Sequence, residues 1–165
     1  MSNTRYYLDT EFNSFGGSLI SLGIVHEDGE GMYLVVPYSD IERMNHEEAM
    51  EPWINVNVIP HIYDCPEGHR YHILSAHLWG PYISDFIYRD EKRPPQIFVD
   101  WPSDAMDFAK LLIAGPGRAV PMQAQTHITI LRHLDVYPTT LPGAIQHHAL
   151  WDAMAIRHLL MELEA

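Results

Sequence analysis

Two acidic residues stand two positions apart near the start of the chain, in the segment RYYLDTEF. This segment alternates and is rich in aromatic and apolar residues, so we expect a strand in which Asp9 and Glu11 point to the same side. Two neighbouring carboxylates on a central strand repel each other, and a bound divalent cation or a shared proton is the usual remedy. Their oxygen ligands suit Mg²⁺ or Mn²⁺ better than Zn²⁺. For an isolated Asp-x-Glu, an edge strand with a solvated acidic face is the simpler alternative.

A histidine pair precedes another carboxylate near the end of the chain, in the segment HHALWDA (147–153). A helix is predicted here because apolar residues recur at helical spacing. These residues are Ala149, Ala153, Ile156, Leu160 and Leu163. Asp152 lies beside this stripe and needs a polar partner. His147 can serve the same site only from the loop before the helix, because it is five residues ahead of Asp152. His148, four residues ahead, would share the helical face of Asp152. The alternative is that one histidine caps the helix and the other is solvated.

Further acidic residues mark a predicted strand-to-helix junction, VDWPSD (99–104). Asp100 and Asp104 flank the expected start of the helix, for which Ser103 is the predicted N-cap. Acidic residues stabilise helix N-termini through the dipole and the free N–H groups. Each aspartate therefore also has a purely structural interpretation.

The remaining pattern predicts the elements that must position these residues. Strands are expected at 5–12, 18–26, 32–36 and 96–99, and helices at 39–50, 77–90 and 126–134, from residue 103 onward and from Ala149 onward. Asp28-Gly29 is a strong hairpin signal, so the second and third strands should be antiparallel neighbours. The sequence therefore predicts one mixed α/β domain over residues 1–165.

The composition limits the compartment and the partners. The chain holds 22 acidic and 10 basic residues, a formal charge of −12, which argues against coating nucleic acid through a broadly basic surface. Bound metal ions can still supply positive charge for a few phosphates. The apolar runs are too short to cross a membrane, the N-terminus has no secretory signal, and Cys65 is the only cysteine. We therefore expect a cytoplasmic protein without disulfides or membrane contact.

Two local clusters compete with the acidic set. A small basic group fits a solvated turn at least as well as a phosphate contact; it consists of Arg89, Lys92 and Arg93. A second group has zinc-ligand residue types and consists of His61, Cys65, His69, His72 and His77. Their spacing matches no standard structural zinc site, so scattered solvent-exposed histidines are the favoured interpretation.

The ordered acidic set resembles the DEDD exonuclease superfamily, in the variant whose last motif carries a histidine (DEDDh). Asp9-Thr10-Glu11 is similar to the first motif, Asp-x-Glu, and residues 147–153 are similar to the third, His-x-Ala-x-x-Asp-Ala. The second motif departs from the family pattern, because Ser103 stands where the family has an aromatic residue. Aligning the strand end puts Asp104 at the metal-binding aspartate, with Asp100 as the alternative. Residues 53–60 also resemble a stand-alone bacterial and phage exoribonuclease subgroup.

The resemblance implies a ribonuclease H-like fold, with a central mixed sheet whose first three strands are antiparallel, flanked by helices. It implies metal-dependent 3′–5′ exonucleolytic hydrolysis of single-stranded nucleic acid, RNA more than DNA. Two Mg²⁺ or Mn²⁺ ions roughly 3.5–4 Å apart would hold the attacking and leaving oxygens. By family analogy Asp9 would bridge both ions, Glu11 and Asp152 would complete one, and Asp104 would hold the other. His147 would take a proton from the attacking water.

The sequence also allows alternative roles for Phe12 and for the carboxylate set. Phe12 would stack a terminal base, although a core position on the opposite strand face is its favoured alternative. Alternative functions are a DNA 3′–5′ exonuclease, a catalytically silent ribonuclease H-like nucleic-acid-binding module, and a metal-independent glycosidase that uses the carboxylate pair. Small relatives in the family are commonly homodimers, and residues 37–95 are the candidate interface.

Overall fold

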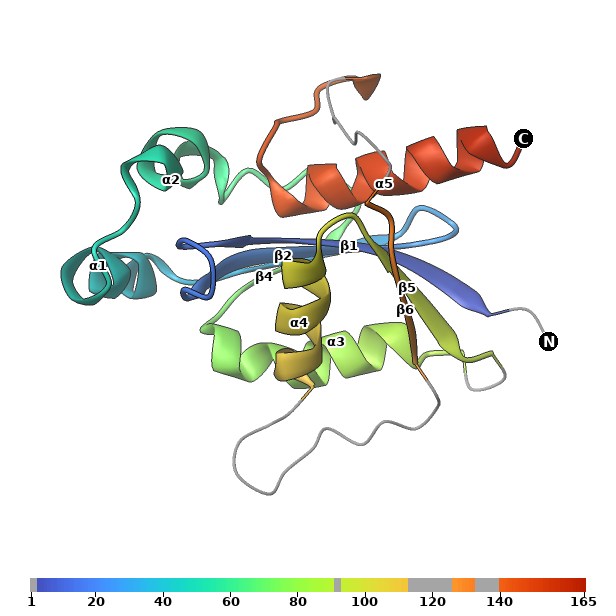
Figure 1. Cartoon of the computed structure of the whole chain (residues 1–165), viewed down its shortest axis with the longest axis horizontal. Helices are drawn as coiled ribbons and strands as arrows, with labels where there is room; N and C mark the ends of the chain where they lie inside the picture. The colour runs from blue at the N-terminus through green and yellow to red at the C-terminus, as the bar shows by residue number, and fades with distance from the viewer. Residues whose placement is uncertain (1–2, 91–92, 113–125, 133–139) are drawn as a thin grey trace.

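The computed structural model describes residues 3–90, 93–112, 126–132 and 140–165, and its centre is a mixed sheet with helices on both faces (Figure 1). The strands in the described ranges are β1 (Thr4–Phe12), β2 (Leu19–His26), β3 (Gly31–Val35), β4 (Arg70–Ile73), β5 (Pro95–Val99) and β6 (His127–Ile130). The helices are α1 (Tyr38–Glu47), α2 (Pro52–Asn57), α3 (Trp79–Ile87), α4 (Pro102–Leu111) and α5 (Ala149–Leu163), with short 3₁₀ turns η1 (Ile59–His61) and η2 (Ala76–Leu78). The strand order is β4-β3-β2-β1-β5-β6, which places β1 in the interior of the sheet.

Strands β1, β2 and β3 form an antiparallel meander, as the sequence predicts. The turn between β2 and β3 contains Asp28-Gly29, and Gly29 has a φ of 100°, which glycine adopts without strain. β5 pairs with β1 in parallel, and β4 and β6 add parallel strands at the two edges. The predicted α/β class with a central mixed sheet is therefore confirmed.

Side chains of β1 alternate between the two faces of the sheet. The Tyr6 hydroxyl donates to the carbonyl of Phe86 in α3 at 3.2 Å, whereas Tyr7 packs with Phe98 and with Ile156 of α5. Figure 1 shows α5 on one face of the sheet and α3 and α4 on the other. Odd-numbered residues of β1 therefore face α5, and even-numbered residues face α3 and α4.

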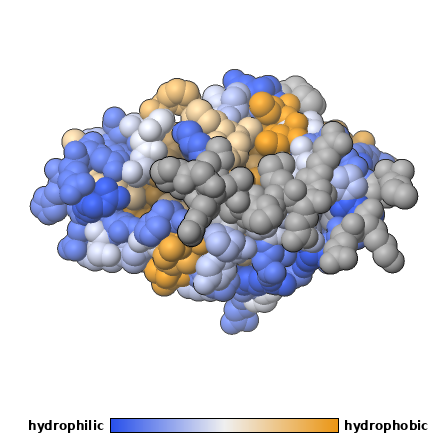
Figure 2. All heavy atoms as spheres, turned by 90° about the horizontal axis from the view of Figure 1, so that it is seen from below, coloured by the Kyte–Doolittle hydropathy of each residue, from blue (hydrophilic) through white to orange (hydrophobic). Residues whose placement is uncertain are grey.

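The face that α3 and α4 cover is mostly hydrophilic, with hydrophobic side chains in separate patches (Figure 2). Tyr82 of α3 and Met106 of α4 are among the exposed apolar side chains. In the part of the chain that the structure describes, no helix is long and apolar enough to span a bilayer.

Two predicted features differ from the structure. Residues 126–134 do not form the expected helix: the described part contains β6, and residues 133–134 lie outside the described residues. The alternating His-Ile-Thr-Ile sequence, rich in β-branched residues, suits the strand that pairs with β5. Ser103 is not the N-cap of α4, because Pro102 takes the first helical position and Trp101 precedes it. The short edge strand β4 lies in a segment whose pattern predicts no element.

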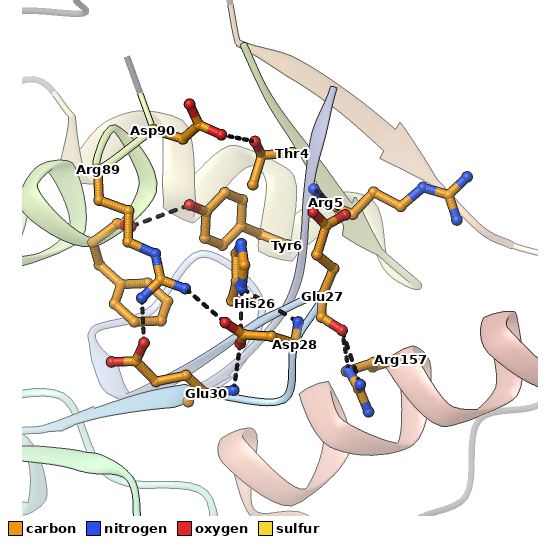
Figure 3. Close-up of polar contacts among 12 residues, drawn as sticks. Thr4, Arg5, Tyr6, His26, Glu27, Asp28, Glu30, Arg89, Asp90 and Arg157 are labelled. Carbon is orange, nitrogen blue, oxygen red and sulfur yellow. Dashed lines mark hydrogen bonds and ion pairs between the residues drawn. The ribbon is translucent and has the colours of Figure 1, made fainter. Parts of the chain in front are cut away.

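Acidic residues of the β2–β3 turn pair with the two described arginines of the basic group that follows α3; Figure 3 shows Arg89 beside Asp28 and Glu30 of this turn. Arg89 forms an ion pair with Glu30, and Arg93 forms one with Glu27 at 3.0 Å. Lys92 lies outside the described residues. Arg89 and Arg93 thus connect the β2–β3 turn to the segment after α3 through ion pairs. This pairing favours a structural role for the two arginines over a contact with a phosphate.

Candidate active site

Five carboxylates meet where β1, the end of β5, the start of α4 and the start of α5 come together. They are Asp9, Glu11, Asp100, Asp104 and Asp152. Asp9 belongs to two groups of three: one adds Glu11 and Asp152, and the other adds Asp100 and Asp104. Within each group, one oxygen of each residue lies within 4.8 Å of the others. Two adjoining sites that share a carboxylate suit a pair of divalent cations.

Strand alternation delivers Asp9 and Glu11 to one face and Thr10 to the other. Asp9 and Glu11 lie on the side of α5, where they meet Asp152. Thr10 points toward α4, where its hydroxyl donates to Asp104 Oδ1 at 2.6 Å. β1 thus supplies two carboxylates of the cluster directly and orients a third, that of Asp104, through Thr10.

The parallel register between β1 and β5 brings Asp100 to Asp9. Paired residues run from Thr4 with Pro95 to Tyr7 with Phe98, and two further steps place Asp9 beside Asp100. The carboxyl ends of parallel strands are where side chains converge in open α/β sheets. The sequence pattern leaves Asp100 and Asp104 as alternatives, and the structure brings both to Asp9.

Two buried acceptor oxygens of this group lack a donor. Asp100 Oδ1 and Asp104 Oδ2 are buried and have no hydrogen-bond partner among the described residues. An anionic oxygen without a donor is costly to bury, and a bound cation removes that cost. The donor set is entirely carboxylate, which suits Mg²⁺ or Mn²⁺. The residues present therefore fit divalent cations of this kind.

A glycine on β2 lets the start of α5 approach Asp9 closely. Gly23 pairs with Asp9 in the β1–β2 ladder, and a Cβ at Gly23 would lie only 2.4 Å from backbone atoms of Ala149. The N–H of His148 donates to Asp152 Oδ2 at 3.1 Å and holds that carboxylate toward the cluster. Gly23 therefore sets how closely α5 can bring Asp152 to the sheet.

His147 lies in the loop before α5 and faces the cleft. The helix begins at Ala149, so the spacing argument that placed His147 ahead of the helix is confirmed. Its φ is 59°, a left-handed conformation that is uncommon outside glycine and turns its side chain away from the helical path. Its ring lies edge-on to Trp53, with centroids 4.7 Å apart. Partial burial lowers the pKa of His147, so the ring is neutral near pH 7.

His148 is a core residue. It is 1% exposed and stacks on Tyr33 with ring centroids 4.4 Å apart. Neither of its ring nitrogens has a hydrogen-bond partner in the described ranges, and burial lowers its pKa to about 4. Its backbone occupies the N-cap position of α5 without a side-chain cap. His148 therefore takes the capping position that the sequence alternative gives to one histidine of the pair, but only through its backbone, because its ring lies in the core.

Burial and mutual repulsion raise the pKa values of the clustered carboxyl groups. Burial is the larger cause and raises the pKa of Glu11 to about 8 and those of Asp104 and Asp152 to about 7. Burial, followed by the charges of its four neighbours, raises the pKa of Asp9 well above its usual value. Divalent cations would reverse these shifts by stabilising the ionised forms.

The cluster lies in a cleft of about 1100 Å³ with several aromatic walls. The aromatic lining residues are Phe12, Phe15, Trp53 and Trp101. Trp53 and Trp101 are 51% and 56% exposed, so part of each ring is open to a ligand, although His147 lies against Trp53 and Arg132 lies over Trp101. Phe12 is half-buried on the cleft wall, not in the core position that the strand pattern favours. Exposed rings beside a carboxylate cluster that could hold cations suit a planar ligand that carries anionic groups.

Three residues of the site carry no motif signal. Gly23 stands in a strand, where a glycine often marks a close approach of another backbone. The sequence signal for Trp101 is its place directly after Asp100, at the end of the strand β5. Arg132 has no local signal, because only the pairing of β6 with β5 brings it to the cleft.

The candidate zinc ligands do not converge. His69 Nδ1 accepts the N–H of Gly31 at 3.0 Å, and His61 contacts Asp64 at 3.1 Å. Among the residues that the structure describes, the groups that could hold a metal ion consist of carboxylates. The interpretation of the histidines as scattered residues is therefore favoured.

The chain matches no family model and no curated protein in comparisons with known proteins. Its chemistry is therefore inferred from the residues themselves. The relevant features are the shared carboxylate, the cleft-lining histidine and the aromatic walls.

Proposed function

We propose that this chain is a metal-dependent 3′–5′ exonuclease with a ribonuclease H-like fold. It removes nucleoside monophosphates from single-stranded nucleic acid, from RNA more readily than from DNA. The observation that carries the proposal is the sharing of Asp9 between two groups of three carboxylates. The six-stranded mixed sheet is compatible with this fold, and the two DEDDh-like motifs support the direction of cleavage.

The carboxylates divide into two ligand sets. Asp9 would contact both cations, Glu11 and Asp152 would hold one, and Asp100 and Asp104 would hold the other. When bound, two Mg²⁺ or Mn²⁺ ions stabilise the charge that develops on the attacking and leaving oxygens of a phosphodiester. Thr10 and the N–H of His148 keep Asp104 and Asp152 in place for this task.

His147 takes a proton from the attacking water. The water oxygen forms the new bond to phosphorus, the bond to the 3′ oxygen of the preceding nucleotide breaks, and that oxygen gains a proton from solvent. The lowered pKa of His147 keeps an unprotonated nitrogen available at neutral pH. The edge contact with Trp53 limits rotation of the ring. His148 has no such role, because it is enclosed in the core.

The cleft walls favour a strand with unpaired bases. Phe12, Phe15 and Trp53 offer rings on which bases stack without regard to sequence. A duplex would keep its base faces covered and gain nothing from these rings. The preference for RNA is supported by the resemblance of residues 53–60, which include Trp53, to the exoribonuclease subgroup.

Digestion of 5′-labelled single strands tests the proposal. RNA and DNA of one sequence are incubated with Mn²⁺, Mg²⁺ or EDTA. We expect a ladder that shortens from the 3′ end, faster on RNA, and no shortening in EDTA. Asp9→Asn should fold but not cleave, because an amide is a neutral, weaker ligand of nearly the same shape. Asp85→Asn makes the same change on an exposed residue of α3 and should cleave normally.

Shortening from the 5′ end, or full activity in EDTA, would contradict the proposal. Turnover of purified Asp9→Asn close to that of the wild type would contradict it as well. Binding of the strand without any shortening would favour the silent binding module.

A further inference from the structure

Arg132 lies over the ring of Trp101 on the cleft wall beside Asp100. Arg132 Cζ is 3.9 Å from the ring centroid, a distance typical of a stacked guanidinium. Trp101 follows Asp100 at the end of β5. Arg132 follows Leu131, whose N–H donates to the carbonyl of Val99 at 2.7 Å. The two residues thus extend neighbouring parallel strands into the cleft.

Arg132 is the permanent cation among the described residues that line the cleft. Arg89 and Arg93 are neutralised by carboxylates, but Arg132 forms no ion pair within the described part of the chain. Stacking occupies the flat face of a guanidinium and leaves its edge N–H groups for bidentate bonds to a phosphate. The charge of Arg132 also opposes the burial that raises the pKa of Asp100. Among the described residues, Arg132 thus places a positive charge beside the acidic cluster without a carboxylate at ion-pair distance.

In the proposed mechanism, the place of His147 determines which end of the substrate would meet Arg132. His147 precedes α5, the helix that carries Asp152, whereas Arg132 and Trp101 lie beside Asp100. In an in-line displacement the attacking and leaving oxygens lie on opposite sides of the phosphorus. With the attacking water at His147, the leaving 3′ oxygen lies on the side of Asp100. The strand that remains after cleavage therefore runs toward Arg132.

We propose that Arg132, held on Trp101, binds the first phosphate of the retained strand, which is the 5′-phosphate of the nucleotide that bears the leaving oxygen. This inference rests on the proposed function. It makes Arg132 a substrate-binding residue and Trp101 its positioning residue. A dinucleotide that carries a 5′-phosphate is then bound better than the same dinucleotide without it.

Binding of two uncleavable dinucleotides tests the inference independently of turnover. Both carry a methylene group in place of the bridging 3′ oxygen, the oxygen that leaves during cleavage. They differ only in the 5′-phosphate. In Mg²⁺, the Kd of the wild type should be roughly 10- to 100-fold lower for the phosphorylated analogue, the range of a charge-assisted hydrogen bond. This ratio should fall below about threefold in Arg132→Met and recover in part in Arg132→Lys, because lysine keeps the charge but loses the fork. Arg43→Met removes a charge from the exposed face of α1 and should keep the wild-type ratio.

The kcat/KM values of cleavable dinucleotides with and without the 5′-phosphate are then compared in the same variants. A ratio near one in the wild type, or an unchanged ratio in Arg132→Met, would overturn the role of Arg132. The proposed nuclease function would still stand in that case if the dinucleotides are cleaved. Absence of cleavage of every strand with any metal would overturn the proposed function and this inference together. If the preference for the phosphorylated dinucleotide falls equally in Arg43→Met, the effect comes from the net charge of the protein. That result would overturn the assignment of a phosphate site to Arg132.

Discussion

Replacing Glu11 by glutamine should stabilise the protein when divalent cations are withheld, and the gain should grow with pH. Burial raises the pKa of Glu11 to about 8, from an ordinary value of 4.5. A carboxyl group whose folded pKa is raised contributes stability that is full below its unfolded pKa and is lost as pH rises through the folded value. At about 1.36 kcal/mol per pH unit, the complete loss approaches about 5 kcal/mol. Burial is the larger cause, and the charges of Asp152, Asp104 and Asp100 add to it. Because these neighbours titrate together with Glu11, we expect Glu11→Gln to gain less than the full loss, about 2–3 kcal/mol at about pH 9.

Thermal unfolding in EDTA at about pH 6 and about pH 9 measures this gain. Each kcal/mol shifts the Tm of a chain of this size by roughly 2–4 °C, so Glu11→Gln should melt roughly 4–12 °C above the wild type at the higher pH. Glu47→Gln makes the same change on the exposed face of α1 and should have little effect. Excess Mg²⁺ should remove the advantage of Glu11→Gln, because the variant lacks a ligand. Equal Tm values for wild type and Glu11→Gln at the higher pH in EDTA would refute charge crowding at this site.

The remaining predictions concern the residues around the carboxylates. His147→Ala should lower turnover by about 10²–10⁴-fold at saturating Mn²⁺ without weakening Mn²⁺ binding, because the histidine is proposed to move a proton and not to hold a metal. Single-turnover kinetics and a Mn²⁺ titration check this. His148→Ala should lower the free energy of unfolding by about 2–4 kcal/mol in urea, because it empties the space beside Tyr33; a loss of turnover at full stability would show that His148 serves the site. Gly23→Ala should lower both the Tm and the affinity for Mn²⁺, because its Cβ displaces Ala149; a calorimetric titration that matches the wild type would contradict this.

Local geometry was enough to predict the features that lie within one element. Period-two alternation places Asp9 and Glu11 on one face of β1 whatever the rest of the fold does. Helical spacing requires His147 to precede α5 if it is to reach the side of Asp152, and the helix does begin after it. The hairpin between β2 and β3 follows from Asp28-Gly29 by the same local logic.

Features that depend on pairing between distant segments could not be predicted in this way. Asp100 joins Asp104 because β5 runs parallel to β1 in one register, and no local pattern specifies that register. Arg132 reaches the cleft because residues 127–130 form a strand beside β5, where the sequence favours a helix. The enclosure of His148 depends on its contact with Tyr33 of β3.

Counting the Mn²⁺ ions that each chain binds tests the central claim most directly. Isothermal titration gives the number, and electron paramagnetic resonance shows whether the bound ions are magnetically coupled. We expect two coupled ions in the wild type and in Asp85→Asn, and a loss of at least one ion and of the coupling in Asp9→Asn, because Asp9 is the ligand common to both groups. A wild-type chain that binds one ion or none, or an Asp9→Asn chain that still binds two coupled ions, would contradict the account.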